Sequence, residues 1–348
     1  MDWTIEKIYF NLINKNFKPY QSSIFKLYQK LGSFEKVYKD LTNKNSLEFN
    51  DPEKEYKKLE KFGIEIAILN EEVYPYKLKS IDEPPLGLYL LGNKSLLKEE
   101  TLFIAIVGTR KATSYGLNTS RKFAKELASL GTVIVSGLAY GIDEEAHKGT
   151  VEVNGKTIAV LGEGIDLVLN SNKKYLIEKI LENDGLIISE YSLETPAMPY
   201  HFPLRNRIIA GISDGILVVE APIDSGALIT ANYGLKYGRE IFVIPGEITN
   251  KNFIGSHNLI KQGARLTTDI EDILTEFGLD LNYKEKLKKV KLSPKEELIC
   301  EIIEKGYKTI EEISKETNLA IQEILIILTH MEIKGIIKNK EGKFYLIQ

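Results

Sequence analysis

The chain has 348 residues, enough for two or three domains, and its formal net charge is −3. A chain so close to neutral has no overall positive field to attract nucleic acid, so any nucleic-acid site must be local. The single cysteine, Cys300, excludes a disulfide framework within the chain. Because no run approaches about eighteen apolar residues, we expect a cytosolic protein with no membrane span.

Residues 1–65 read as short amphipathic helices that form a small domain. The turn K-L-G-S-F at 30–34 resembles that of a helix–hairpin–helix motif, although a helical packing domain explains it equally well. Further on, Pro84-Pro85 force an extended backbone. The segment that follows them, L-G-L-Y-L-L-G, is therefore expected to be a strand or a strap on the next domain.

Residues 66–280 are expected to form the central domain, and from about 101 to 280 apolar runs alternate regularly with helical patterns. The runs are 102–107, 132–135, 157–161, 186–188, 216–219 and 241–244. Short β-branched runs that alternate with helices are typical of a parallel sheet, and their nearly continuous apolarity fits strands covered on both faces. The sequence therefore predicts an α/β fold, an extended Rossmann-like, doubly wound and mostly parallel sheet.

The C-terminal part is expected to be a separate domain. A lysine-rich segment, 281–291, reads as a linker, and 292–348 shows three helical patterns followed by two short strands around Glu341-Gly342. This order is typical of a winged-helix domain. From 291 to 348 there are nine lysines and ten glutamates, so this domain is a poor neutraliser of phosphate, and we predict that it contacts protein.

Four glycine-containing turns follow predicted strands or open predicted helices. They are V-G-T-R (107–110), S-G-L-A-Y-G-I-D (136–143), L-G-E-G-I-D (161–166) and D-S-G-A-L-I-T-A (224–231). In a parallel sheet such turns share the carboxyl edge, where ligands bind near the reversal of strand order. Small residues also let backbone N–H groups approach phosphate. Each turn alone could be structural, but together they indicate a phosphate-binding edge.

The segment F-P-L-R-N-R (202–207) adds positive charge to this pattern. Pro203 restricts its own backbone and predicts a turn that leads into a helix. Arg205, Asn206 and Arg207 would then lie at the start of that helix, where guanidinium groups and free N–H groups both favour an anion. A structural ion pair explains two arginines about as well, and the neighbouring glycine turns favour phosphate.

Several other chemistries lack their signatures. There is no G-x-x-x-x-G-K-[S/T] for a P-loop and no G-x-G-x-x-G after the first strand of the sheet for a dinucleotide. Asp143 and His147 have i, i+4 spacing that could pair on a metal, but capping by the aspartate and packing of the histidine are more common. Ser136 and Ser225 are nucleophile candidates by residue type alone. We expect no metal, no cofactor and no catalytic residue.

Seven segments resemble one known family, in order along the chain. They are V-G-T-R-K-A-T-S-Y-G, S-G-L-A-Y-G-I-D-E-E-A-H, G-L-I-I-S-E-Y, H-F-P-L-R-N-R-I-I-A-G, V-V-E-A-P-I-D-S-G-A-L-I-T-A, V-I-P-G and G-S-H-N-L-I-K-Q-G-A. Across roughly 74–270 the chain is similar to the DNA-processing protein A (DprA/Smf) family. The resemblance implies a homodimer that binds single-stranded DNA without catalysis, and that loads a RecA-type recombinase onto incoming strands during natural transformation.

The resemblance also implies which residues bind the strand. Arg110 would contact phosphate, Phe202 would stack on a base, and the R-N-R residues would contact the strand or hold the loop that does. Family members often carry a basic residue shortly before the F-P element, and here Lys261 or Arg265 would have to replace it. The full implied set is Gly108, Thr109, Arg110, Ser136, Gly137, Phe202, Arg205, Asn206, Arg207, Ser225, Gly226, Thr230 and Lys261.

Two other functions stay open on sequence grounds. A Rossmann-like enzyme or sensor for a free nucleotide, similar to nucleotide phosphoribohydrolases, would carry a P-G-G-x-G-T signature, of which Pro245-Gly246-Glu247 is a fragment. A protein-interaction scaffold would explain the helical N-terminal part and the near-neutral C-terminal domain.

Overall fold

The computed structural model describes residues 4–16, 22–45, 51–98, 101–279, 293–303, 308–317, 319–333, 337–340 and 342–346. The chain forms two compact units that divide between Ile273 and Leu274. The expected linker, 281–291, lies outside the described residues.

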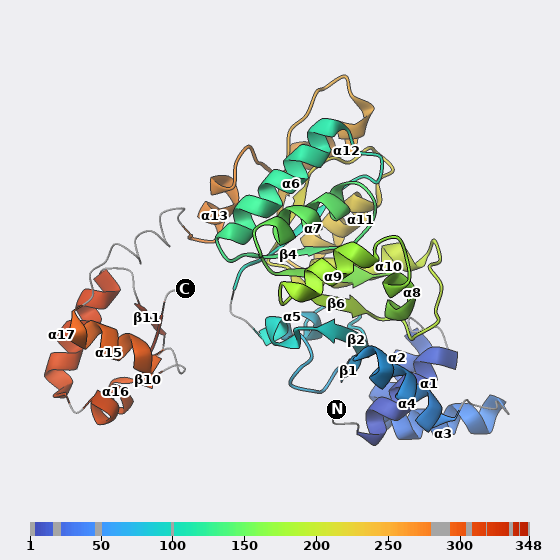
Figure 1. Ribbon diagram of the computed structural model, residues 1–348, viewed down its shortest axis with the longest axis horizontal. Coiled ribbons are helices and arrows are strands. Elements are labelled where there is room, and N and C mark those ends of the chain that lie inside the picture. The colour runs from blue at the N-terminus through green and yellow to red at the C-terminus, as the bar shows by residue number, and fades with distance from the viewer. Residues whose placement is uncertain are drawn as a thin grey trace. The chain divides into compact units, whose positions relative to one another are not determined.

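A nine-stranded, mostly parallel sheet is the centre of the first unit (Figure 1). The strand order is β1-β2-β6-β5-β4-β3-β7-β8-β9, and only the β1–β2 and β2–β6 pairs are antiparallel. The predicted α/β fold with a mostly parallel sheet is thus confirmed. The strands are β1 (Glu65–Ile68), β2 (Gly87–Gly92), β3 (Phe103–Val107), β4 (Val133–Ser136), β5 (Thr157–Leu161), β6 (Leu186–Ser189), β7 (Gly215–Val218), β8 (Glu240–Val243) and β9 (Arg265–Leu266).

The six predicted apolar runs coincide with β3 to β8, and every residue of β3 to β7 is buried. Because both faces of the sheet are covered, the apolarity of these strands is continuous rather than alternating. The segment after Pro84-Pro85 is a strand of the sheet, β2. The sequence analysis missed β1 and β9, the two edge strands, because strands of four and two residues are too short to show a pattern.

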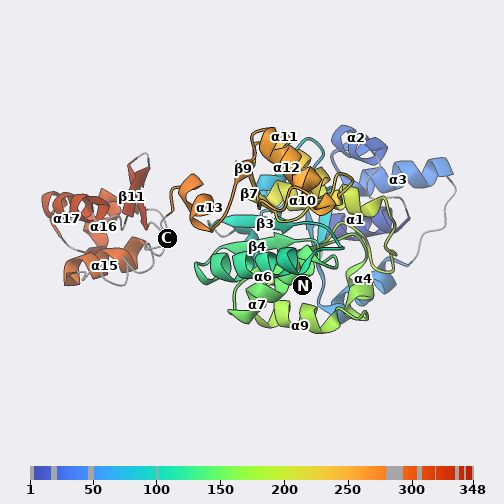
Figure 2. The ribbon, with the colours of Figure 1, turned by 90° about the horizontal axis from the view of Figure 1, so that it is seen from above.

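Helices cover both faces of the sheet, with α6, α7 and α9 on one side and α10, α11 and α12 on the other (Figure 2). This layering follows from the βαβ connections between parallel strands. The helices are α5 (Tyr76–Lys79), α6 (Ser114–Ser129), α7 (Ile142–Glu152), α8 (Ile165–Leu169), α9 (Lys174–Glu182), α10 (His201–Ile212), α11 (Gly226–Lys236), α12 (Ile254–Lys261) and α13 (Glu271–Glu276), with the 3₁₀ turns η1 (Lys94–Lys98) and η2 (Lys251–Phe253).

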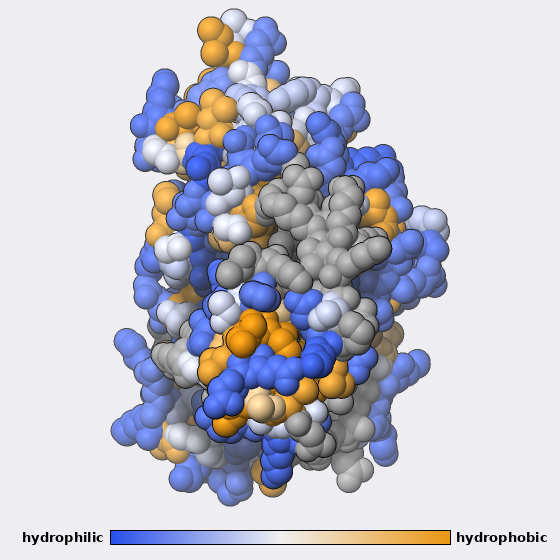
Figure 3. All heavy atoms as spheres, turned by 90° about the vertical axis from the view of Figure 1, so that its left-hand side faces the viewer, coloured by the Kyte–Doolittle hydropathy of each residue, from blue (hydrophilic) through white to orange (hydrophobic). Residues whose placement is uncertain are grey.

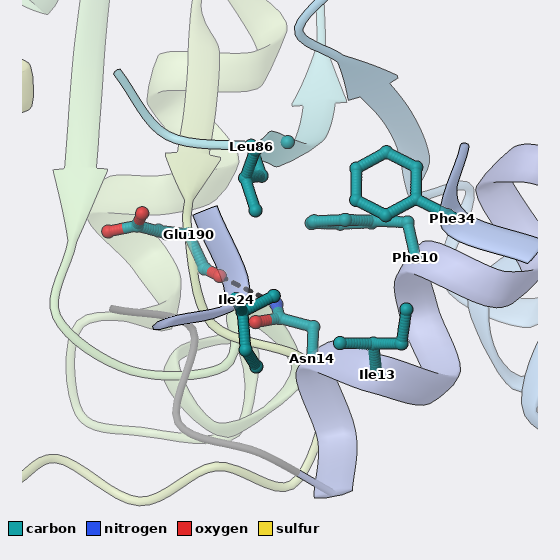
Figure 4. Close-up of a pocket in the computed structure, with 8 residues that line it drawn as sticks. Phe10, Ile13, Asn14, Ile24, Phe34, Leu86 and Glu190 are labelled. Atoms are coloured by element: carbon teal, nitrogen blue, oxygen red, sulfur yellow. Dashed lines mark hydrogen bonds between the residues drawn. The ribbon is translucent and has the colours of Figure 1, made fainter. Parts of the chain in front are cut away.

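The N-terminal helices share one apolar core with the sheet. Phe10 and Phe34 belong to the same buried cluster as Tyr89 of β2 and Ile187 of β6. Figure 4 shows α1 beside the chain after β6, where the Asn14 amide donates to the backbone oxygen of Glu190 over 2.8 Å. These helices are α1 (Ile5–Asn16), α2 (Ser22–Leu31), α3 (Phe34–Asn45) and α4 (Pro52–Phe62).

The second unit has its own core. Ile299, Ile313 and Leu328 come from three different helices and pack in one buried cluster with Phe344. A three-stranded antiparallel sheet in the order β10-β12-β11 completes the unit. Its elements are α15 (Pro294–Ile303), β10 (Lys308–Thr309), α16 (Ile310–Thr317), α17 (Ile321–Ile333), β11 (Ile337–Lys340) and β12 (Lys343–Leu346).

Candidate functional site

A cavity of about 640 Å³ opens at the carboxyl edge of the parallel strands. Residues after β3, β4 and β7 line it together with the first turns of α10 and α11. The lining residues are Val107, Gly108, Thr109, Arg110, Lys111, Ala139, Asp143, Pro199, Phe202, Pro203, Arg205, Asn206, Ile209, Pro222, Asp224, Ser225, Gly226, Ala227 and Thr230. We call this cavity the edge pocket.

The position of the edge pocket follows from the strand order. After β3 the chain adds β4, β5 and β6 on one side, and it then crosses to add β7 and β8 on the other. The loops after β3 and β7 therefore separate towards opposite faces, which creates the crevice where ligands bind in open α/β sheets.

The rim of the edge pocket carries an exposed arginine stacked on an aromatic ring. The Arg110 guanidinium lies 4.5 Å from the centre of the Phe202 ring, which is a cation–π contact. Gly162 lies against an edge of the same ring, and a Cβ atom at this position would approach the ring carbons to 3.1 Å. A base can therefore stack on the ring face that Arg110 covers only after Arg110 moves aside.

A buried carboxylate holds the loop that carries Arg110. The Glu220 side chain is fully buried and accepts hydrogen bonds from the backbone N–H and hydroxyl of Thr113, at 3.1 and 2.8 Å. The Asn252 amide donates to the same carboxylate and also to the Lys111 carbonyl. The Thr109 N–H donates to the backbone oxygen of Glu220 over 2.8 Å. The loop is therefore tied on both sides of Arg110, and the backbone that presents it is held in place before any ligand binds.

The first residues of α11, Gly226 and Ala227, line the edge pocket together with the preceding Ser225. Ser225 is the N-cap residue, and its hydroxyl accepts a hydrogen bond from the Ala227 N–H over 3.3 Å. The Asn206 amide donates to the Gly226 carbonyl over 3.1 Å and so ties α10 to this turn. A helix of eleven residues that begins at the pocket provides partial positive charge for an anion, in the same cavity that Arg110 lines.

Two buried side chains of opposite charge, Asp143 and Arg205, form the floor of the edge pocket. The Gly137 N–H donates to the Asp143 carboxylate over 3.2 Å, and the Arg205 guanidinium donates to the carbonyl oxygens of Gly137 and Val160. Burial raises the pKa of Asp143, although Arg205 opposes this. Burial also lowers the pKa of Arg205 to about 10. Gly137 must be glycine, because a Cβ atom there would lie 2.2 Å from the Arg205 guanidinium.

Other residues of the expected set lie away from the pocket. Arg207 is buried, and its guanidinium pairs with both Glu190 carboxylate oxygens at 2.6 and 2.8 Å. For Arg207, the structural ion pair that the sequence analysis gave as the alternative to phosphate binding is therefore the correct explanation. The Ser136 hydroxyl donates to the Ile106 carbonyl inside the sheet. Lys261 is exposed at the end of α12 and does not line the pocket.

The structure thus brings nine of the thirteen expected residues to one pocket. These are Gly108, Thr109, Arg110, Phe202, Arg205, Asn206, Ser225, Gly226 and Thr230. Gly137, Ser136, Arg207 and Lys261 are not among its lining residues, although Gly137 supports the floor. The sequence analysis missed Lys111 and Asp224 as lining residues, and both lie inside motifs that it quoted.

His147 is buried and packs beside Thr157 of β5. Its Nδ1 lies 2.8 Å from the Thr157 hydroxyl, which in turn donates to the Ile134 carbonyl. Because that hydroxyl proton is already used, the histidine Nδ1 must be the donor. Within the described ranges there is no group of three metal-ligating side chains. Nor does any helix there have the length and apolarity needed to cross a membrane.

Known proteins match this chain over the whole sheet. A family model described as "DNA recombination-mediator protein A" matches residues 65–278. Protein Smf of Escherichia coli is 44% identical over 212 residues, which are 60% of this chain and 56% of that protein. The DNA processing protein DprA of Streptococcus pneumoniae is 40% identical over 224 residues, 64% of this chain and 76% of that protein.

Two solved structures have the same fold. DNA processing protein A of Streptococcus pneumoniae superimposes with a TM-score of 0.64 and 32% identity, covering 79% of this chain and 99% of that chain. The Helicobacter pylori protein, described for its single-stranded DNA binding mode, has a TM-score of 0.56 and 29% identity, covering 62% of this chain and 96% of that chain.

Proposed function

Because the chain belongs to the DNA-processing protein A (DprA/Smf) family, we propose that it binds single-stranded DNA in the edge pocket. The observation that carries the proposal is the convergence of an exposed guanidinium, an aromatic ring and a helix N-terminus on one cavity. The guanidinium and the helix N–H groups suit a phosphate, and the Phe202 ring suits a base.

The proposal assigns different roles to the rim and the floor. Arg110 and the Gly226 N–H contact the strand, while Arg205 holds the loops at Gly137 and Val160 in place. Two cations on the rim, Arg110 and Lys111, are enough for local neutralisation of a few phosphates. The chain can therefore bind a polyanion although its net charge is −3.

The test is a fluorescence titration with single-stranded and duplex oligonucleotides across a range of salt. We expect a preference for the single strand and a shallow salt dependence that corresponds to a few released ions. Equal affinity for the duplex would contradict the proposal. Release of free base from a nucleoside monophosphate would instead support an enzyme similar to nucleotide phosphoribohydrolases.

We propose further that the C-terminal unit is a winged-helix domain that contacts protein, a RecA-type recombinase in particular. Among the residues of this unit that the structure describes, Leu298, Ile321, Leu325 and Ile326 have exposed apolar side chains. Figure 3 shows apolar side chains gathering on the face of this unit that is turned towards the viewer. Exposed apolar surface without excess positive charge suits a protein partner better than a DNA groove.

A recombinase-loading assay on single-stranded DNA tests this second proposal. The variant Leu325→Glu should lose stimulation of filament assembly while it keeps its affinity for the strand, because the edge pocket is unchanged. Undiminished stimulation by this variant would exclude the exposed face of α17 as the contact.

The remaining parts of the proposal concern assembly and organisation. We propose a homodimer that works without a cofactor in the cytoplasm during natural transformation. Its domains are a helical domain at 1–65, the DNA-binding domain at 66–280 and the winged-helix domain at 292–348, with 281–291 as linker. Light scattering should report twice the chain mass of 39.4 kDa, and a single-chain mass at working concentration would contradict the dimer.

A further inference from the structure

A second cavity, of about 250 Å³, adjoins the edge pocket. The two cavities share Arg110, Ala139 and Phe202 as lining residues, so the stacked Arg110–Phe202 pair lies at their border. We call the second cavity the side pocket. Its other lining residues are Gly137, Leu138, Tyr140, Leu161, Gly162, Glu163, Val168, Ser171, Asn172 and Lys173.

The side pocket has two aromatic rings and a cation. Besides Phe202, it presents the half-exposed ring of Tyr140, whose hydroxyl accepts a hydrogen bond from the Asn172 amide over 2.7 Å. The Lys173 ammonium group lies 4.5 Å from the centre of the Tyr140 ring and donates to the Leu138 carbonyl. Leu138 has a left-handed backbone, with φ of 54°. Tyr140 and Lys173 are thus held in place, and the Tyr140 ring offers a surface for stacking.

The pocket also has a carboxylate whose oxygens are available. Glu163 is partly buried, and among the described residues no hydrogen-bond or ion-pair partner is found for its carboxylate. Burial raises the pKa of Glu163, while Lys173 and Arg205 oppose this. A partly desolvated carboxylate without a donor gains stability from a ligand that supplies N–H groups.

We propose that the side pocket binds one base of the strand and prefers guanine, with Glu163 as the acceptor for its N–H groups. This inference rests on the proposed binding of single-stranded DNA and adds a base preference to it. The side pocket adjoins the phosphate-binding rim, so a base next to the phosphate on Arg110 can enter it.

The preference follows from the donors that each base offers. Guanine presents N1–H and the N2 amino group side by side, so both carboxylate oxygens of Glu163 can accept a hydrogen bond. Thymine presents one N–H between two carbonyl oxygens, which repel a carboxylate. Adenine and cytosine each offer an amino group beside a ring nitrogen that is an acceptor. A two-bond contact discriminates against a wrong base by about tenfold or more.

The test measures the affinity of the full chain for labelled oligothymidine of roughly twelve nucleotides, with and without one central guanine. A single guanine avoids four-stranded structures. We expect wild type to bind the guanine strand about tenfold more tightly. The variant Glu163→Gln should lose most of this difference, because an amide has only one acceptor oxygen. The readout is the ratio of the two affinities, since the lost charge can change the affinity for both strands alike.

The matched control is Glu178→Gln, which makes the same charge change at an exposed position on α9 that lines neither pocket. It should keep the full guanine preference. Equal affinity of wild type for both strands, or a preference that survives Glu163→Gln, would overturn the side-pocket assignment. If wild type binds both strands equally and Arg110→Ala weakens both, only this inference fails. If wild type binds no strand, the proposed function fails too.

Discussion

Arg110 and Arg207 carry the same group in two different regions of the molecule. Arg110 lies exposed on the rim of the edge pocket and stacks on Phe202, whereas Arg207 lies in the interior and pairs with Glu190. The rim has cations available for a ligand, and the interior uses its cation to neutralise a buried acid. The difference teaches that arginines expected at one binding site can serve either binding or stability, and that burial decides which of them does which.

Breaking the interior pair should have the largest effect. Replacing Arg207 by methionine leaves the Glu190 charge buried without its partner, which costs about 3–5 kcal/mol of unfolding free energy. Urea unfolding measures this loss. The double variant Arg207→Met/Glu190→Leu should recover much of it, because no lone buried charge remains. A loss below about 1 kcal/mol in the single variant would place Arg207 in the same class as a surface residue.

The next largest effect should come from the titration of buried His147, which makes the unfolding free energy depend on pH. Burial lowers the pKa of His147 from 6.5 to about 3. Between these values the unfolded chain takes up a proton that the folded chain does not, so unfolding free energy falls as pH falls, by up to about 1.4 kcal/mol per pH unit. His147→Asn keeps a donor for Thr157 and removes the titration. Its stability should fall less steeply from pH 6.5 to 4.5 than that of wild type, and equal slopes would contradict the prediction.

Removing the rim arginine should affect binding and leave stability almost unchanged. We expect Arg110→Ala to weaken binding of oligothymidine about tenfold, the value of one charge-assisted contact. The slope of log affinity against log salt should fall by roughly 0.7, as expected for one phosphate on a single strand. Thermal unfolding should stay close to wild type, since Arg110 is exposed. Unchanged affinity would remove the rim from the proposed site.

Lys261 should give the smallest effect and serves as the charge-matched control for Arg110. It lies on α12 and does not line the edge pocket, so Lys261→Ala should change the affinity for a strand of about six nucleotides less than twofold. A loss as large as that of Arg110→Ala would extend the strand path to α12, and would supply the basic contact that is missing before Phe202.

More of the fold than of the candidate site could be predicted from the sequence. Apolar runs revealed β3 to β8, since strands buried on both faces need continuous apolarity. The edge strands β1 and β9 were missed because four and two residues are too few to form such a run. In the site, the glycine turns and the R-N-R segment indicated the right edge of the sheet. They could not separate Arg205 and Arg207 from Arg110, because burial depends on which elements pack over each residue.

The amino-acid sequence by itself determined the α/β class, the positions of the buried strands along the chain and the edge where the ligand-suited loops meet. These features depend on local periodicity and on turn residues, which neighbours in the chain specify. Only the tertiary structure decided that Arg110 faces solvent while Arg207 meets Glu190, and that Tyr140, Glu163 and Lys173 line one pocket. Such pairings join residues from different loops, and their geometry exists only after the sheet has brought those loops together.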